Sequence, residues 1–235
     1  MKPLPILVLA LLAPSFALAE VPSLADDSKV ASFDILSANV TRSGSTLTFR
    51  MTTAGVAGAD TPVATGALAG APVHAYVWPT SLDPAAVGFE PGSGILALAA
   101  TSHPDFDDTP LYDENNDGDP ANDGLDWHSH WVVLVPSDDC GPAALAVRDI
   151  PEGSTPQLPK TWPGLPLFID SPDATPVFDG PTVSVEITVD GTEGASFDGV
   201  TSALRVNANL HAPLLCVTDV FDVASGDLSL PGKID

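Results

Sequence analysis

The sequence predicts an all-β fold, an antiparallel β-sandwich of about nine strands with one long acidic loop. Aliphatic and polar residues alternate with a period of two in several segments, which is typical of strands that bury one face. The 24 prolines and 19 glycines favour frequent turns over long helices. Hydrophobic residues make up 44% of the chain, which is enough to form a core despite a formal net charge of -23.

The clearest alternation lies in residues 183–190, where aliphatic side chains take one face and polar side chains the other. The predicted strands are residues 33–41, 46–53, 73–78, 95–100, 127–135, 143–148, 183–190, 201–211 and 214–223. The first two should form a hairpin across Ser43-Gly44-Ser45. Residues 132–135 are apolar on both faces and predict a central strand. Residues 101–126 and 151–181 show no strand pattern, so we expect a long acidic loop and a proline-rich connection.

Residues 1–19 have the pattern of a secretory signal peptide. Lys2 supplies a positive charge, residues 4–12 form an apolar run, and Ala17-Leu18-Ala19 is a small-x-small cleavage pattern. A retained anchor is the alternative, but the run is too short to span a bilayer. No later segment is apolar enough to be a transmembrane segment. We therefore expect a periplasmic or secreted protein with one β-sandwich domain, residues 20–235.

The two cysteines are expected to pair. In an oxidising compartment, Cys140 and Cys216 are most simply joined as a disulfide bond. Free or metal-bound thiols are the alternative. The acidic composition, 31 acidic against 8 basic residues, excludes nucleic acid as a natural partner and attracts cations instead. Solubility alone would also account for this charge.

A histidine pair indicates a transition-metal site. His128 and His130 are two residues apart on a predicted strand, so both side chains leave the same face. Two imidazoles so placed can converge on one zinc or copper ion, although a chance pair has the same spacing. Further ligands must come from elsewhere, and the candidates are His103, Asp105, His74 and His211. Each of these histidines could instead be an ordinary hydrogen-bonded residue.

The loop before this pair resembles the first half of a calcium-binding loop. Oxygen ligands occur at alternate positions, and Gly118 allows a sharp bend. The match then fails, because Gly124 stands where an EF-hand has a bidentate glutamate. We expect a calcium ion bound in a non-EF-hand manner, with a solvated acidic loop as the alternative. The candidate calcium ligands are Asp113, Asn115, Asp117, Asp119, Asp123 and Asp126.

Two short stretches resemble known families. The segments Phe33-Asp34-Ile35, Val40-Thr41 and 47–52, with Gly44 at the turn, are similar to the first strands of DOMON-like and family-9 carbohydrate-binding β-sandwich domains. That resemblance implies a sandwich fold, and members of the group bind haem or sugars and often hold calcium. His128 to Trp131 resembles the His-x-His-Trp strand of α-type carbonic anhydrases over four residues, and the other motifs of that family are absent.

Three functions are therefore open. The first is an exported metal-binding protein with a zinc or copper site beside a calcium-binding loop, which is more consistent with a binding protein than with an enzyme. The second is an exported zinc-dependent hydrolase or lyase that uses a metal-bound water. The third is a calcium-stabilised carbohydrate-binding or adhesion module, in which Tyr76, Trp78, Trp127 and Trp131 would stack on sugars unless they belong to the core.

Overall fold

The computed structural model describes residues 19–107, 113, 117–119, 123–150 and 174–234. Residues 1–18 of the predicted signal peptide, the candidate ligand Asn115 and residues 151–173 of the proline-rich connection lie outside the described residues. None of the helices in the described ranges is long and apolar enough to span a membrane.

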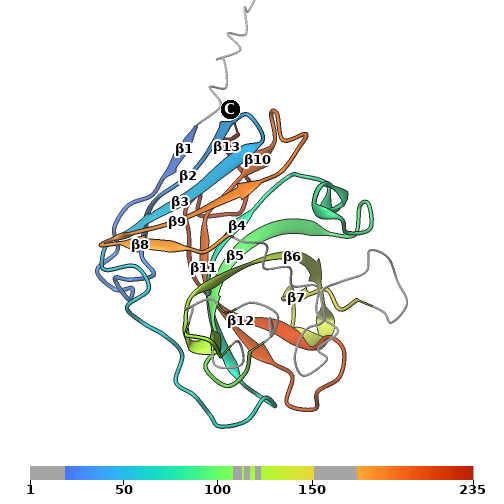
Figure 1. The fold of residues 1–235 in the computed structure, drawn as a ribbon. Helices are drawn as coiled ribbons and strands as arrows, with labels where there is room; N and C mark the ends of the chain where they lie inside the picture. Colours follow the sequence, from blue (N-terminus) through green and yellow to red (C-terminus); the bar gives the residue numbers. More distant parts are fainter. Residues whose placement is uncertain (1–18, 108–112, 114–116, 120–122, 151–173, 235) are drawn as a thin grey trace, which may run out of the picture.

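The strands form two main units, a five-stranded antiparallel sheet and a closed six-stranded barrel (Figure 1). The sheet has the order β1-β2-β3-β9-β8. Its strands are β1 (Glu20–Pro22), β2 (Ile35–Ser43), β3 (Thr46–Thr53), β9 (Thr182–Thr188) and β8 (Val177–Asp179). β2 and β3 form the predicted hairpin, paired from Ser43↔Thr46 onwards.

The barrel has the order β11-β12-β7-β6-β5-β4, and the first and last strands pair with each other to close it. Its strands are β4 (Pro72–Pro79), β5 (Ile95–Ser102), β6 (His128–Pro136), β7 (Leu145–Val147), β11 (Val200–Val206) and β12 (Leu215–Val223). A small separate pair joins β10 (Ser196–Phe197) to β13 (Gly232–Lys233). The described residues also include three 3₁₀ turns: η1 (Pro84–Val87), η2 (Asp123–Leu125) and η3 (Asp138–Cys140).

The barrel corrects the predicted sandwich, while the all-β antiparallel class is confirmed. Period-two alternation shows which side chains share a face, but it does not reveal which strands pair at long range. Each predicted strand segment overlaps an observed strand, although residues 207–211 turn away where we expected the strand to continue. β6 is buried on both faces, as its apolar run indicated.

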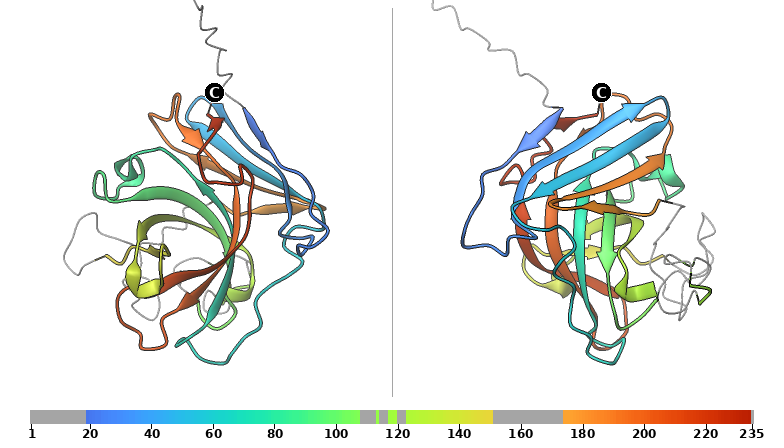
Figure 2. Two further views of the ribbon diagram at one scale, coloured as in Figure 1. Left: turned by 180° about the vertical axis from the view of Figure 1, so that it is seen from behind. Right: turned by 60° about the vertical axis from the view of Figure 1, so that its left-hand side comes forward.

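Two hydrophobic cores result from this arrangement. One lines the barrel interior and contains Val73, Ala75 and Val77 of β4. The other lies between the barrel and the five-stranded sheet, which rests against one side of the barrel (Figure 2). In this second core Phe49 of β3 meets Trp131 of β6 edge-on, with ring centroids 5.8 Å apart.

Polar contacts also join the two units. Asp222 of β12 accepts a hydrogen bond from the Ile35 backbone N–H at the start of β2, 2.7 Å away. The same carboxylate accepts one from Lys29 Nζ at 2.8 Å. Because Asp222 is 7% exposed, this carboxylate is a buried link between barrel and sheet.

The predicted disulfide bond is confirmed. Cys140 and Cys216 are bonded, with Cα atoms 5.5 Å apart. The bond connects η3 to the start of β12, beside the place where β7 pairs with β12 through Leu215↔Val147 and Cys216↔Ala146. It therefore reinforces the seam at which the short strand β7 completes the barrel.

Candidate metal centre

The inner face of the barrel carries the candidate metal site. Side chains alternate along β6, and the ones that point inward are His128, His130, Val132 and Leu134. Along the neighbouring β5 the inward positions are Ala97, Ala99 and Thr101, and His103 continues this spacing just past the strand. The two strands pair antiparallel with Thr101 opposite His128 and Ala99 opposite His130. His103 is therefore a diagonal neighbour of His128 on one face, which brings three histidines together.

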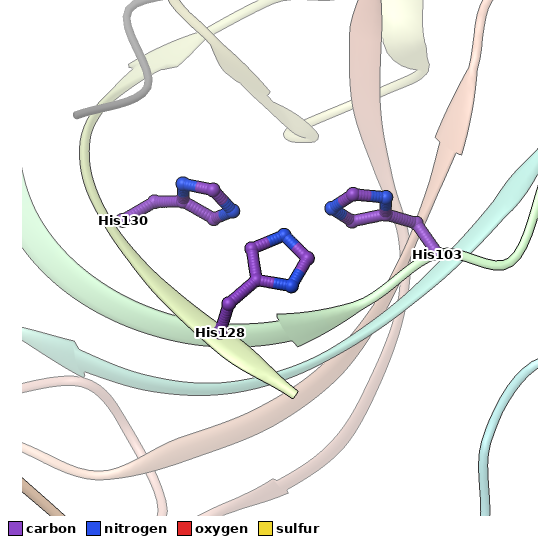
Figure 3. Close-up of side chains that lie close together, drawn as sticks. All are labelled: His103, His128 and His130. Carbon is purple, nitrogen blue, oxygen red and sulfur yellow. The ribbon is translucent and has the colours of Figure 1, made fainter. Parts of the chain in front are cut away.

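The three imidazoles converge. One nitrogen from each of His103, His128 and His130 lies within 4.8 Å of the other two. Ring centroids are 4.5 Å apart for His103 and His128, and 4.7 Å apart for His128 and His130. Each ring directs one nitrogen into the space between them (Figure 3). All three side chains are buried, with exposures of 2%, 1% and 1%.

Backbone carbonyls fix the tautomers of two of the rings. His103 Nδ1 lies 2.7 Å from the Phe106 carbonyl oxygen, and His128 Nδ1 lies 2.8 Å from the Asp126 carbonyl oxygen. A carbonyl oxygen can only accept, so each Nδ1 carries a proton, and in the neutral ring Nε2 is then the nitrogen with a lone pair for a metal ion. This is the usual arrangement in metal-binding histidines, where a hydrogen bond to the second ring nitrogen orients the first.

The turn around η2 holds His103 in place. The His103 backbone N–H donates to the Gly124 carbonyl at 2.5 Å, and Ser102 Oγ donates to the Leu125 carbonyl at 2.8 Å. A Cβ atom at Gly124 would collide with the Phe106 carbonyl oxygen and lie 2.6 Å from that of His103. Position 124 thus requires glycine for close packing behind a histidine, which explains the residue that departs from the EF-hand pattern.

The other candidate ligands do not join the cluster. His74 lies on the opposite face of β4 from Ala75, where it meets Phe33 edge-on at 5.2 Å and contacts the Asp60 carbonyl through Nδ1. His211 is exposed beyond β11 and contacts the side chain of Asn207.

Asp105 supports a neighbouring loop instead. Its carboxylate accepts hydrogen bonds from the backbone N–H groups of Thr65 and Gly66, at 2.8 Å and 2.5 Å, and from the Thr65 hydroxyl. Partial burial opposes ionisation of this carboxyl, but these hydrogen bonds outweigh it and lower the pKa of Asp105 below its ordinary value.

The described acidic residues show turn geometry. Asp113 accepts hydrogen bonds from the N–H groups of Asp117 and Gly118, and Asp117 accepts one from the Asp119 N–H. Asp123 is fully buried within η2, whereas Asp126 is exposed and contributes its carbonyl to His128. Within the described ranges, the three histidines form the group suited to holding an ion, and these carboxylates are not part of it.

A cavity of about 70 Å³ adjoins the histidines inside the barrel. Its polar lining residues are His103, His130, Thr101 and Ser202, and the remaining wall is almost entirely apolar. The prediction from sequence missed Thr101 and Phe106. The alternation of Ala97, Ala99, Thr101 and His103 along β5 was the available signal for Thr101.

The aromatic side chains considered for sugar stacking belong to the core. Tyr76, Trp78 and Trp131 are each at most 1% exposed, and Trp127 is half-buried and donates through Nε1 to the Gly58 carbonyl. No family model, no curated protein and no solved structure matches the chain. The histidine cluster itself is therefore the basis for interpreting function.

Proposed function

We propose that the chain is an exported metal-binding protein in which His103, His128 and His130 bind one zinc or copper ion. The observation that carries the proposal is the convergence of three buried imidazoles, each with a ligand nitrogen within 4.8 Å of the others. Burying three adjacent imidazoles costs free energy because their ring nitrogens lose water, and a shared metal ion would offset that cost. The signal-like residues 1–19 and the disulfide bond support the export part of the proposal.

The distances suit a first-row transition metal. A point equidistant from three atoms that are 4.8 Å apart lies about 2.8 Å from each, against the roughly 2.1 Å of a zinc–nitrogen bond. Each ring would need to move by at most about 0.7 Å to close on an ion. Three neutral imidazoles suit zinc, and copper(II) accepts the same ligands.

Metal analysis of protein purified without a histidine tag tests the proposal. We expect one zinc or copper ion per chain in the wild type and loss of that ion in the double variant His128→Ala/His130→Ala. His211→Ala is the matched control, since it removes an exposed histidine outside the cluster and should leave the metal content unchanged. An unchanged metal content in the double variant, with a native circular dichroism spectrum, would refute the proposal.

The calcium ion expected in the acidic loop is the second part of this proposal. Its support is the spacing of Asp113, Asp117 and Asp119 around Gly118. Calorimetric titration of the protein with calcium tests this site, with Asp117→Asn/Asp119→Asn as the variant. We expect the calcium signal to disappear in this variant while the transition-metal content stays the same, so the two sites are separable.

A zinc-dependent hydrolase or lyase is the second candidate function. The cavity beside His103 and His130 favours it, because a substrate bound there would lie next to an ion held by three protein ligands. A zinc-bound water would supply the nucleophile. The test compares the zinc-loaded and metal-free protein in ester hydrolysis and carbon dioxide hydration assays, and equal rates for the two forms would exclude this function.

A further inference from the structure

The barrel cavity is large enough for a small molecule. A cavity of roughly 10–15 Å³ can hold one water molecule, and an engineered cavity of about 150 Å³ in another protein binds benzene. At about 70 Å³, less than half of that volume, the barrel cavity has room for an apolar tail of roughly three carbon atoms. Its body is lined by aliphatic side chains, among them Val77, Val132 and Val200. That wall favours an apolar ligand.

One end of the cavity is polar. Thr101 lines the cavity, is 7% exposed, and lies directly opposite His128 in the β5–β6 ladder. Its hydroxyl oxygen is buried and has no hydrogen-bond partner among the described residues. A buried hydroxyl without a partner is unfavourable, so this position is suited to a polar group brought by a ligand.

Charge decides which polar group fits. Imidazole binds a metal ion through an unprotonated nitrogen and is then a neutral ligand, so an ion held by the three histidines would keep its positive charge. Apolar surroundings strengthen the attraction between that charge and an anion. A carboxylate could contact the ion with one oxygen and accept a hydrogen bond from Thr101 with the other.

We propose that the barrel cavity binds a small monoanion with an apolar tail, a short-chain carboxylate, whose headgroup meets the metal ion and the Thr101 hydroxyl. This inference rests on metal binding by the three histidines. The aliphatic wall favours an apolar ligand tail, and the ion and Thr101 favour a carboxylate headgroup. The cavity volume limits the length of the tail. Cations and long-chain acids are excluded by the same features.

The full chain loaded with Co²⁺ in place of zinc tests the inference. The visible absorption of the bound Co²⁺ is recorded while formate, acetate, propionate, butyrate and hexanoate are added. Affinity should rise about fourfold per added methylene up to butyrate, since each buried methylene contributes a similar free energy. The affinity should fall at hexanoate, whose tail is too long for the cavity. Addition of n-butylammonium should leave the Co²⁺ absorption unchanged.

Three variants separate the contribution of the carboxylate headgroup from that of the apolar tail. Thr101→Val keeps the shape but removes the hydroxyl, and it should weaken butyrate binding about tenfold while leaving Co²⁺ content unchanged. Thr101→Ser should restore the affinity. Val77→Leu narrows the cavity and should weaken butyrate more than formate.

The outcomes are distinguishable from failure of the metal proposal. If the protein takes up no Co²⁺, the metal site itself is refuted. If Co²⁺ binds but its spectrum is unchanged by every carboxylate, or the affinity does not depend on chain length, the cavity inference is overturned while the metal site stands. Equal butyrate affinity in Thr101→Val and the wild type would overturn the role of that hydroxyl.

Discussion

Removing the disulfide bond should lower stability strongly and leave the metal site intact. Cys140 and Cys216 are separated by 76 residues, so their bond restricts a long loop of the unfolded chain. The loop-entropy relation gives about 4.5 kcal/mol at 25 °C for this length. For a chain of this size, that corresponds to a decrease of roughly 10–15 °C in Tm.

The disulfide bond lies where β7 closes the barrel against β12, so its removal should weaken this part of the barrel. β7 pairs with β12 through two residue pairs, next to the disulfide bond, so the seam depends on the covalent link. The histidines lie on the β5–β6 ladder instead, which pairs from Ile95↔Leu134 to Thr101↔His128. The variant Cys140→Ser/Cys216→Ser should therefore unfold more easily yet keep its metal.

Urea unfolding followed by circular dichroism measures the difference in the free energy of unfolding. Wild-type protein in the presence of reductant should match the double variant, and the variant itself should not respond to reductant. A difference below about 1 kcal/mol would refute the loop-entropy reasoning. Loss of metal from the folded variant would refute the separation of seam and site.

Three further perturbations test the fold and the site. Asp222→Ala should lower the free energy of unfolding by about 2–3 kcal/mol in urea titrations, because it leaves the buried Ile35 N–H without its acceptor and removes the partner of Lys29; Asp222→Asn should lose less. Burial raises the pKa of Tyr76 to about 12, so its stabilising effect is complete below the unfolded pKa near 10 and is lost as the pH rises through 12. Absorbance near 295 nm should show no Tyr76 ionisation in the folded protein at pH 10.5, which a Tyr76→Phe difference spectrum would check. Chelation of the metal should leave the far-ultraviolet spectrum unchanged and lower Tm only by the stabilisation that binding had added, RT ln(1 + [metal]/Kd), whereas unfolding of the metal-free chain would contradict a preformed site.

The strand pattern was predictable because period-two alternation is a local property. Residues 46–53 were predicted as a strand with the bounds that β3 has in the structure. Barrel closure was not predictable, because it depends on β11 pairing with β4 across more than a hundred residues. Both faces of β4 are buried, and the sequence could not distinguish an inner barrel face from a face that packs on a second sheet.

The site shows the same division between local and long-range information. The shared face of His128 and His130 follows from their spacing on one strand. As a histidine, His74 was as good a candidate ligand as His103. The alternation of Val73, Ala75 and Val77 instead places it on the outer face of β4. His103 was a candidate only as part of a loop, since its position depends on the register between two strands.

That register is what makes the cluster a prebuilt site. Thr101 pairs with His128, so His103, two positions later and just past the end of β5, lies diagonally across from the same histidine. A shift of one residue in either strand would turn one group of histidines out of the barrel. The small inward residues Ala97 and Ala99 oppose such a shift, because Leu96 and Leu98 would take their places and overfill the barrel interior. The packing that stabilises the barrel therefore also fixes the three imidazoles, and the fold has already met the ordering cost of the site before any ion binds.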